Sequence, residues 1–207
     1  EEDPMTVAHK THWNQRYAQE FQGHRSARSW LTEHMDMVHM RAQWVRTQGR
    51  MPTGLDLACG PGRNTFFLAE QGWRMTGIDI SDEAVALGQE RARQCGLDGQ
   101  LSYIAADLDH WQPQADTYDL ILCFFFLDRA LWPAMRTALR PGGLLIMETF
   151  NSHRRDSFPS DFLLKPEEFY TAIRSWGWEI VASRSDGPAL PRPTDAIVAV
   201  KPSPFVA

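Results

Sequence analysis

The chain has 207 residues, the length of one ordinary domain, and its 43% hydrophobic and 23% charged residues are typical of a globular protein. The net charge of −5 provides no basic excess to neutralise phosphates, so the composition disfavours a nucleic-acid partner. The longest apolar run, Leu120 to Leu127, is far shorter than the roughly 20 residues of a membrane helix, and we expect no membrane partner.

The two ends and the cysteines give an expectation about location. The acidic N-terminus is unlike a signal peptide, and residues 1–4 stand before Met5, a candidate natural start. Cys59, Cys95 and Cys123 are too few and too scattered for a disulfide framework. We therefore expect a soluble protein of the cytoplasm; its oligomeric state is not indicated.

Short apolar strands alternate with helical segments along the chain, which predicts an α/β fold with helices on both faces of a mostly parallel sheet. The last two strands follow each other without a helix, so we expect them to form an antiparallel hairpin at the sheet edge. The predicted helices span residues 10–21, 29–48, 63–71, from Ser81 to Gly96, 133–139, and from Pro166 onward. The predicted strands span residues 53–58, 73–78, 101–105, 118–123, 144–150, 179–185 and 196–200.

The same pattern divides the chain into regions of one domain, 1–207, since no repeat or linker interrupts it. Residues 5–50 form a helical cap, 51–150 a ligand-binding core, and 151–207 a loop, a helix and the terminal hairpin. The loop at 151–164 is a candidate lid, because a long connection without secondary structure is usually functional in a compact domain. It carries His153, Arg154, Arg155 and Phe158; solvation at the surface is an equally good explanation of its arginines.

The strongest motif is the glycine-rich turn after the first strand, Cys59-Gly60-Pro61-Gly62. Such a turn between a buried strand and a helix lets the backbone approach a ligand closely. The third glycine of a dinucleotide fingerprint is missing, because Thr65 stands in its place. Asp56, four residues before Gly60, instead favours a ligand that carries an ammonium and a sulfonium group.

Two further aspartates stand at the ends of the next predicted strands. Asp79, at the end of the second strand, can accept hydrogen bonds from vicinal ribose hydroxyls. Asp107, at the end of the third, can accept from an adenine amine while Leu108 packs on the ring. An N-cap role for Asp79 and an exposed turn for Asp107 are the plain alternatives.

Taken together, these motifs resemble the class I S-adenosylmethionine-dependent methyltransferases over about residues 50–150. The resemblance rests on Leu55 to Gly62, on Gly77-Ile78-Asp79, on Asp107, on Tyr118 to Ile121 and on Leu139 to Gly143. The family's first glycine is Ala58 here. His12 to Tyr17, Glu148 to Asn151 and Phe162 to Pro166 are similar to the small bacterial tellurite-resistance-type branch.

The resemblance implies a Rossmann-like seven-stranded sheet with one reversed strand, an N-terminal segment folded over the cofactor, and a small methyl acceptor. S-adenosylmethionine would be the cofactor and S-adenosylhomocysteine the product, with Arg16 paired to the cofactor carboxylate or to an anionic acceptor. The residues predicted to bind the cofactor are Arg16, Asp56, Ala58, Gly60, Gly62, Asn64, Asp79, Ile80, Asp107, Leu108 and Cys123.

On the acceptor side we predict Trp13, Phe125, Arg129, His153 and Arg154. The segment Cys123-Phe124-Phe125-Phe126 replaces the Asn/Asp-Pro-Pro-aromatic tetrad of enzymes that methylate exocyclic amines, so that activity is disfavoured. No general base can be identified, and the cations favour an oxyanion, a carboxylate or a thiol as acceptor. No metal site is expected, because His34 and His39 would point away from each other on one helix.

Three other functions stay open. An NAD-dependent oxidoreductase is disfavoured by the missing glycine, and a methyltransferase acting on RNA or protein by the acidic charge. A non-catalytic S-adenosylmethionine-binding protein would share every cofactor motif.

Overall fold

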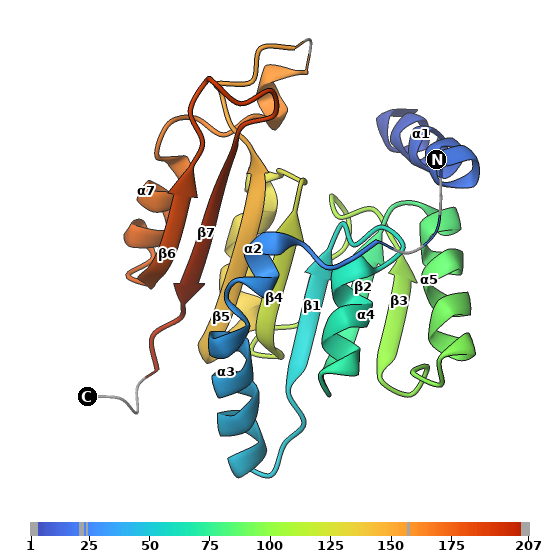
Figure 1. The fold of residues 1–207 in the computed structure, drawn as a ribbon, viewed down its shortest axis with the longest axis vertical. Helices are drawn as coiled ribbons and strands as arrows, with labels where there is room; N and C mark the ends of the chain where they lie inside the picture. The colour runs from blue at the N-terminus through green and yellow to red at the C-terminus, as the bar shows by residue number, and fades with distance from the viewer. Residues whose placement is uncertain (1–3, 21–22, 24, 157, 204–207) are drawn as a thin grey trace.

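The computed structural model describes residues 4–20, 23, 25–156 and 158–203, and shows a seven-stranded sheet with helices on both faces (Figure 1). The strand order is β3-β2-β1-β4-β5-β7-β6, and β7 alone runs against its neighbours. The predicted mostly parallel fold with a terminal antiparallel hairpin is confirmed. The strands are β1 (Thr53–Leu57), β2 (Arg74–Asp79), β3 (Leu101–Ala105), β4 (Tyr118–Phe124), β5 (Leu139–Phe150), β6 (Glu179–Ser185) and β7 (Thr194–Val200).

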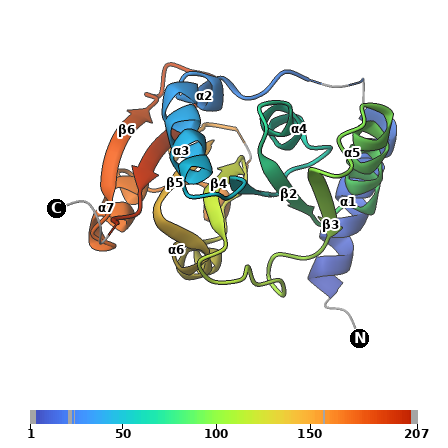
Figure 2. The ribbon, with the colours of Figure 1, turned by 90° about the horizontal axis from the view of Figure 1, so that it is seen from below.

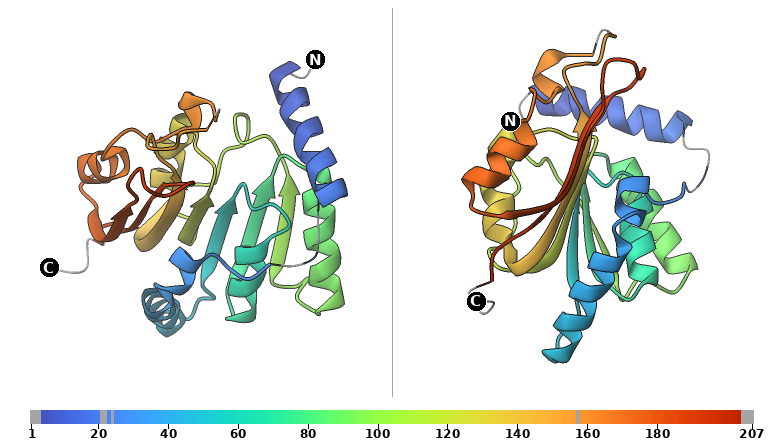
Figure 3. Two further views of the ribbon diagram at one scale, coloured as in Figure 1. Left: turned by 45° about the horizontal axis from the view of Figure 1, so that its top comes forward. Right: turned by 60° about the vertical axis from the view of Figure 1, so that its left-hand side comes forward.

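Helices cover the two faces of the sheet unequally (Figure 2). One face carries α2 (Ser29–Thr32), α3 (Met35–Thr47), α4 (Arg63–Glu70) and α5 (Asp82–Gln94), and the other carries α6 (Trp132–Ala138) and α7 (Glu168–Ser175). The first helix, α1 (Pro4–Glu20), belongs to neither layer: it packs on α5 and stands beyond the carboxyl ends of the strands (Figure 3). The loop after β5 stands above the same edge and contains a short 3-10 helix (Ser160–Phe162).

Alternate residues of the central strands feed two hydrophobic cores, one on each face. In β4, Leu120 and Leu122 pack under α3 and α4, whereas Ile121 and Cys123 pack with α6 and α7. Every residue of β4 is buried, as expected for a parallel strand covered on both sides. Because helices cover both faces of the sheet, polar side chains on such a strand can reach solvent only near its two ends.

The predicted helix over residues 29–48 is wrong, because the chain breaks it into α2 and α3. His34 leaves helical geometry (φ −115°, ψ 20°), and its Nδ1 lies 2.8 Å from the carbonyl oxygen of Trp30. The hydroxyl of Thr32 donates to the carbonyl of Ser29 at 3.0 Å. Side chains that bond nearby backbone groups compete with the helix in this way. His34 and His39 therefore do not share one helix.

Two boundaries in the second half also differ from the predictions. β5 begins at Leu139 instead of residue 144, because the backbone of Gly142 and Gly143 already exchanges hydrogen bonds with Lys201 (2.8 and 3.0 Å). Pro166 is not in the first turn of a helix, since α7 begins at Glu168. The N–H groups of Lys165 and Glu168 close a turn before the helix, on the Glu168 carboxylate (2.8 Å) and the Lys165 carbonyl (3.1 Å).

Within the described ranges, none of the helices combines the length and apolar character needed to cross a bilayer. In the same part of the chain, no three His, Cys, Asp or Glu side chains are grouped so that they could hold a metal ion.

A buried carboxylate ties the amino ends of the central strands together. Asp119 is fully buried and accepts from Arg41 (2.9 Å), from Arg140 (3.2 Å) and from the backbone N–H of Thr53 (3.2 Å); Arg50 lies 3.4 Å away. Arg41 is itself buried and reaches across from α3. Removing one member of such a group leaves the others as uncompensated buried charges.

We predict that Asp119→Asn lowers the free energy of unfolding by about 3–5 kcal/mol, because Arg41 then stays buried without its anion. Urea unfolding monitored by circular dichroism would measure the loss. Asp116→Asn is the matched control, since Asp116 is exposed and its ion pair with Lys201 at 3.4 Å is worth little. Equal stability of the two variants would show that the Asp119 cluster does not hold the strands.

Candidate functional site

The carboxyl ends of the parallel strands open on a cavity of about 840 Å³. It lies at the point where the strand order changes direction, between β1 and β4, where open α/β sheets usually bind ligands. Its volume is near the upper end of small-ligand pockets, roughly 300–1,000 Å³. Most of the predicted site residues line it: Trp13, Arg16, Asp56, Ala58, Gly60, Asn64, Asp79, Ile80, Asp107, Leu108 and Phe125.

Gly60 is the glycine of the turn that faces this cavity. Its φ is +55°, and its backbone N–H donates to the carboxylate of Asp79 at 2.7 Å. A Cβ on Gly60 would stand 2.6 Å from the hydroxyl oxygen of Tyr17, so a side chain there would displace the Tyr17 ring of α1. The turn therefore depends on glycine both for its conformation and for the close approach of α1.

Gly62 and Cys123, predicted to bind the cofactor, lie outside the lining of the cavity. A Cβ on Gly62 would stand 2.1 Å from the hydroxyl oxygen of Tyr103, so this glycine makes room for a core tyrosine. Cys123 is buried in the core beneath α6, and its thiol donates to the carbonyl of Phe126 at 3.6 Å. Both residues therefore pack in the protein interior next to the cavity and do not line it.

Asp56, the penultimate residue of β1, is a buried carboxylate with few partners. Its Oδ2 accepts from the hydroxyl of Thr65 at 2.7 Å, and 2% of the residue is exposed. Burial raises the pKa of Asp56 to about 7, against the smaller opposite effect of the Thr65 hydrogen bonds. A cation in the cavity would restore the ionised form.

Asp79 is the carboxylate that joins the end of β2 to the glycine turn. Besides Gly60, it accepts from the backbone N–H of Ser81 at 2.9 Å, and 6% of the residue is exposed. Burial raises its pKa, and hydrogen bonds from the backbone of Ser81, Gly60 and Ile80 oppose that rise. Each oxygen keeps a second lone pair, so Asp79 can still accept from a ligand.

The end of β3 contributes Asp107 and the buried Leu108 to the same cavity. The Asp107 carboxylate accepts from the hydroxyl of Thr6 at 2.5 Å and from the backbone N–H of Asp109 at 3.0 Å. The Thr6 contact brings α1 over the end of β3, so the first helix covers the half of the cavity lined by the aspartates.

A second polar contact holds the C-terminal half of α1 against α5. The hydroxyl of Ser81, the N-cap of α5, accepts from Ala84 N–H at 3.1 Å and donates to the Asn14 side chain of α1 at 2.7 Å. Trp13 and Arg16 lie beside Asn14 and line the cavity, with the Arg16 guanidinium 5.1 Å from the centre of the Trp13 ring. α1 therefore brings both an aromatic and a cationic side chain to the site.

The other predicted acceptor residues differ in their placement. Phe125 lines the cavity, but Arg129, His153 and Arg154 do not. Arg129 forms a two-point ion pair with Glu168 (2.5 and 2.8 Å) and donates to the carbonyls of Asp161 and Leu163 (2.8 and 3.0 Å). All three guanidinium nitrogens donate hydrogen bonds. Because the acceptors lie in the loop and on α7, Arg129 joins the loop to this helix.

The two loop residues are also held by their own neighbours. Arg154 makes a two-point ion pair with Asp156 (both contacts 2.6 Å), and its guanidinium lies 4.1 Å from the Phe150 ring centre and 4.0 Å from that of Phe158. The backbone N–H of His153 donates to the side chain of Asn151 at 3.0 Å. Arg154 thus stabilises the wall of the cavity from outside its lining.

Several residues that line the cavity were missed by the sequence analysis as site residues. They come from α1, from the segment before α2, from the carboxyl ends of β5 and β6, and from the start of β7 and the loop before it, and they include Tyr17, Arg28, Glu148, Phe150, Arg184, Arg192 and Thr194. Glu148 had a signal that could have found it, since it lies near the end of a buried strand as Asp79 does. Arg28 had none, because its position depends on the path of the chain before α2.

Comparison with known proteins agrees with this geometry. The sequence profile of the family described as "Methyltransferase domain" matches residues 55–143, which contain the glycine turn and all three aspartates. The chain is 30% identical over 120 residues to a ubiquinone biosynthesis O-methyltransferase of Aeromonas salmonicida, over 54% of this chain and 50% of that protein. It is 39% identical over 103 residues to a trans-aconitate 2-methyltransferase of Streptomyces avermitilis, over 45% of this chain and 37% of that protein.

The chain thus spans about half or less of the length of these curated relatives. Its fold is similar to that of TehB from Haemophilus influenzae, with a TM-score of 0.64, 19% identity, and coverage of 91% of this chain and 67% of that one. At this identity the likeness concerns the fold alone, so the resemblance to one branch stays a prediction. The family match covers residues 55–143, and the seven-stranded sheet, the glycine turn and the aspartates lie where the resemblance to the class I S-adenosylmethionine-dependent methyltransferases implies them.

Proposed function

We propose that this protein transfers the methyl group of S-adenosylmethionine to a small acceptor. The observation that carries the proposal is the convergence of Asp56, Asp79 and Asp107, from the ends of three adjacent strands, on one cavity beside Gly60. Three carboxylates on one side of a cavity suit a ligand that presents cations and N–H or O–H donors. They suit a dinucleotide poorly, because its pyrophosphate would be repelled.

The residues fit this cofactor group by group. Asp56 faces the ammonium and sulfonium end, Asp79 receives the ribose hydroxyls, and Asp107 receives the adenine amine with Leu108 against the ring. The open lone pairs of Asp79 and the raised pKa of Asp56 support these roles, since both carboxylates gain from a donor or a cation. Arg16 is assigned to the cofactor carboxylate or to an anionic acceptor.

The chemistry demands alignment more than proton transfer. When bound, S-adenosylmethionine supplies a methyl carbon on a positively charged sulfur; an acceptor lone pair forms the new bond, and the electron pair of the broken carbon–sulfur bond stays on sulfur. The protein holds acceptor and methyl group in line and keeps water out, which α1 and the loop after β5 support by covering the cavity. No residue is assigned as a general base.

The acceptor is proposed to be a small molecule with an oxyanion, carboxylate or thiol group. The curated relatives named above are described as acting in ubiquinone biosynthesis and on trans-aconitate, which supports a small acceptor. The net charge of −5 disfavours RNA, and a non-catalytic binding protein is the remaining alternative. Turnover distinguishes these possibilities.

The first test is cofactor binding. A ligand at 100 times its dissociation constant stabilises a fold by about 2.7 kcal/mol, and each kcal/mol raises the melting temperature of a domain of this size by roughly 2–4 °C. S-adenosylmethionine or S-adenosylhomocysteine should therefore raise it by about 5–10 °C in a thermal-shift assay, whereas NAD should not. The reverse pattern would overturn the proposal.

Turnover is measured with S-adenosylmethionine labelled in its methyl group. We expect label in small anions or thiols before nucleosides, tRNA or proteins. Preferential labelling of tRNA or of a protein side chain would contradict the proposed acceptor class, and binding without transfer to any acceptor would favour the non-catalytic alternative.

The second test concerns Asp79. Asp79→Asn removes a charged acceptor from the ribose hydroxyls, a loss of about 1.5–3 kcal/mol per hydrogen bond, and its amide oxygen can accept from only one of the two backbone N–H groups of Gly60 and Ser81. We expect the affinity for S-adenosylhomocysteine in calorimetry to fall at least about tenfold. Asp98→Asn, an exposed loop aspartate, is the control, and equal affinity of both variants would show that Asp79 does not bind the ribose.

The third test uses the pKa of Asp56, which burial raises to about 7. Between pH 6 and 8 this carboxyl changes from mostly neutral to mostly ionised, so the affinity for S-adenosylmethionine should rise by about tenfold if binding needs the anion. In the folded protein without cofactor, the raised pKa makes this group's contribution to stability fall as the pH rises through 7.

Calorimetry at several pH values would compare the wild type with Asp56→Asn. The amine of the cofactor titrates in both experiments, so the difference between the two curves reports on Asp56 alone. The affinity of Asp56→Asn should rise less steeply with pH than that of the wild type. Equal slopes for the two proteins would show that Asp56 does not bind the cofactor.

A further inference from the structure

The half of the cavity away from the aspartates is walled by aromatic rings. Phe125, Phe150, Phe158 and Phe162, here called the phenylalanine wall, all line it. Their ring centres follow one another at 5.0, 5.5 and 6.4 Å, from the end of β4 through the end of β5 to the loop. Such a wall offers apolar contact area but no hydrogen bonds.

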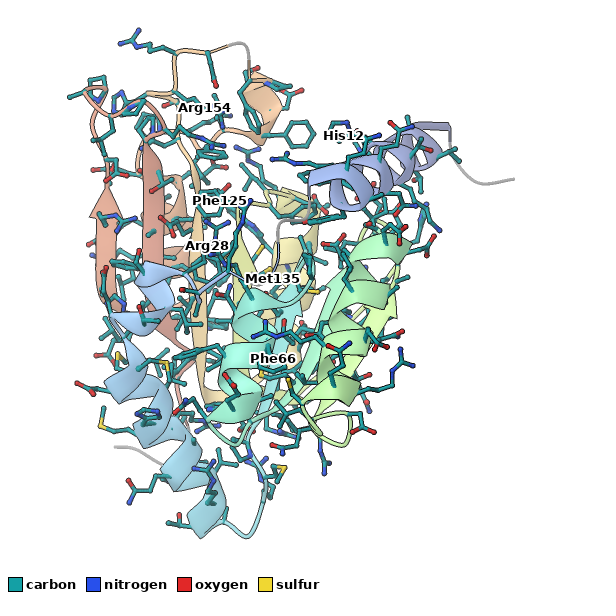
Figure 4. All side chains as sticks on the ribbon, turned by 45° about the vertical axis from the view of Figure 1, so that its right-hand side comes forward. His12, Arg28, Phe66, Phe125, Met135 and Arg154 are labelled. Atoms are coloured by element: carbon teal, nitrogen blue, oxygen red, sulfur yellow. The ribbon has the colours of Figure 1, made fainter. Side chains whose placement is uncertain are left out.

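Arg28 places a positive charge against this wall. Its guanidinium carbon lies 4.2 Å from the centre of the Phe125 ring, and its backbone N–H is fixed by the side chain of Asn64 at 2.9 Å. Figure 4 shows Arg28 and Phe125 next to each other, below Arg154. In the part of the chain that the structure describes, no carboxylate lies within ion-pair distance of the Arg28 guanidinium.

The surroundings of Arg28 favour an anion. Burial lowers the pKa of Arg28 to about 10; the neighbouring charges of Arg63 and Arg25 act in the same direction, and that of Glu148 opposes them. The side chain is therefore still cationic at neutral pH, but it is partly desolvated and repelled by like charges. A bound anion would offset both effects.

The acidic side chains on the same side are paired with cations and hydroxyl or N–H donors, which reduces their repulsion of an anion. Glu148 accepts from Arg184 at 2.6 Å and from the Thr194 hydroxyl at 3.1 Å, and Asp186 accepts from the backbone N–H of Thr194 at 3.0 Å and lies 3.5 Å from Arg184. Arg192, whose guanidinium lies 5.1 Å from the Phe150 ring centre, adds a second cation to the lining. The local balance of charge is positive.

Phe125 is also held in a backbone conformation that a bulky residue rarely adopts. Its φ is +58°, and its N–H donates to the carbonyl of Glu148 at 2.7 Å. Residues of this kind persist where the surrounding structure fixes them, and they cluster at ligand sites. The hydrogen bond to Glu148 fixes this conformation and so keeps the ring in the wall beneath Arg28.

We infer that the methyl acceptor is an organic anion with a flat apolar body, which packs on the phenylalanine wall while its anionic group pairs with Arg28. The inference rests on the proposed function and narrows its acceptor class. A bare inorganic oxyanion or a small thiol would leave the rings without contact, and a neutral aromatic molecule would leave Arg28 without its anion.

The experiment uses the full chain saturated with S-adenosylhomocysteine and three probes in calorimetry: benzoate, benzamide and acetate. Benzoate carries both features, benzamide lacks the charge, and acetate lacks the ring. We expect benzoate to bind at least tenfold more tightly than either of the others. Equal binding of acetate or of benzamide would overturn the inference.

Two variants test which residue recognises the anionic group of the probe and which residue contacts its ring. Arg28→Gln should reduce the affinity for benzoate at least tenfold and leave that for benzamide unchanged, whereas Phe125→Leu should weaken both. Arg174→Gln is the matched control, because Arg174 lies on α7 outside the cavity and stacks on Tyr170 at 5.5 Å. Unchanged benzoate binding in Arg28→Gln would overturn the assignment.

Affinity for S-adenosylhomocysteine, measured first in every variant, separates a failure of the proposed function from a failure of the inference about the acceptor. A wild type that does not bind this cofactor product contradicts the proposed function itself. A wild type that binds it but does not prefer benzoate contradicts only the inference about the acceptor.

Discussion

The hydrogen bond from the backbone of Gly60 to the carboxylate of Asp79 is the contact on which the site depends. It joins the turn after β1 to the end of β2, and the same carboxylate accepts from Ser81 as α5 begins. Ser81 then holds Asn14, which brings α1 across the cavity. One buried carboxylate thereby positions the glycine turn, the start of α5 and, through Ser81, α1. The free-energy cost of burying this carboxylate is offset by backbone hydrogen bonds and not by a cation.

The cavity is divided by charge. Asp56, Asp79 and Asp107 make one half negative, while Arg28 and Arg192 make the other half positive. Desolvated charges of either sign are unfavourable until an opposite charge or a donor reaches them. A cationic cofactor and an anionic acceptor would each relieve one half, and the two would meet with opposite charges at the boundary. The same arrangement disfavours two ligands of one sign.

The sequence could predict the sheet and the aspartates for one physical reason. A residue at the carboxyl end of a buried parallel strand must emerge at the same edge as its neighbours, so Asp79 and Asp107 could be placed from strand boundaries alone. Arg28 and Phe158 obey no such rule, because their positions depend on how irregular segments return over the sheet. The helix break at His34 was missed because side-chain bonds to the backbone overrode an apolar pattern.

The two covers of the cavity are held by different kinds of contact. α1 is held by the hydrogen bonds from Thr6 to Asp107 and from Ser81 to Asn14 and by the partly exposed ion pair of Lys10 with Asp82 (2.9 Å). An incoming donor or water can replace these contacts at little net cost. The loop after β5 is fastened by the Arg129–Glu168 ion pair and by the buried bond from Asn151 to Asp195 at 2.7 Å. Opening the loop would leave charged groups without partners, which costs considerably more. Access to the aspartate half is therefore less costly through α1, while the loop keeps the phenylalanine wall in place.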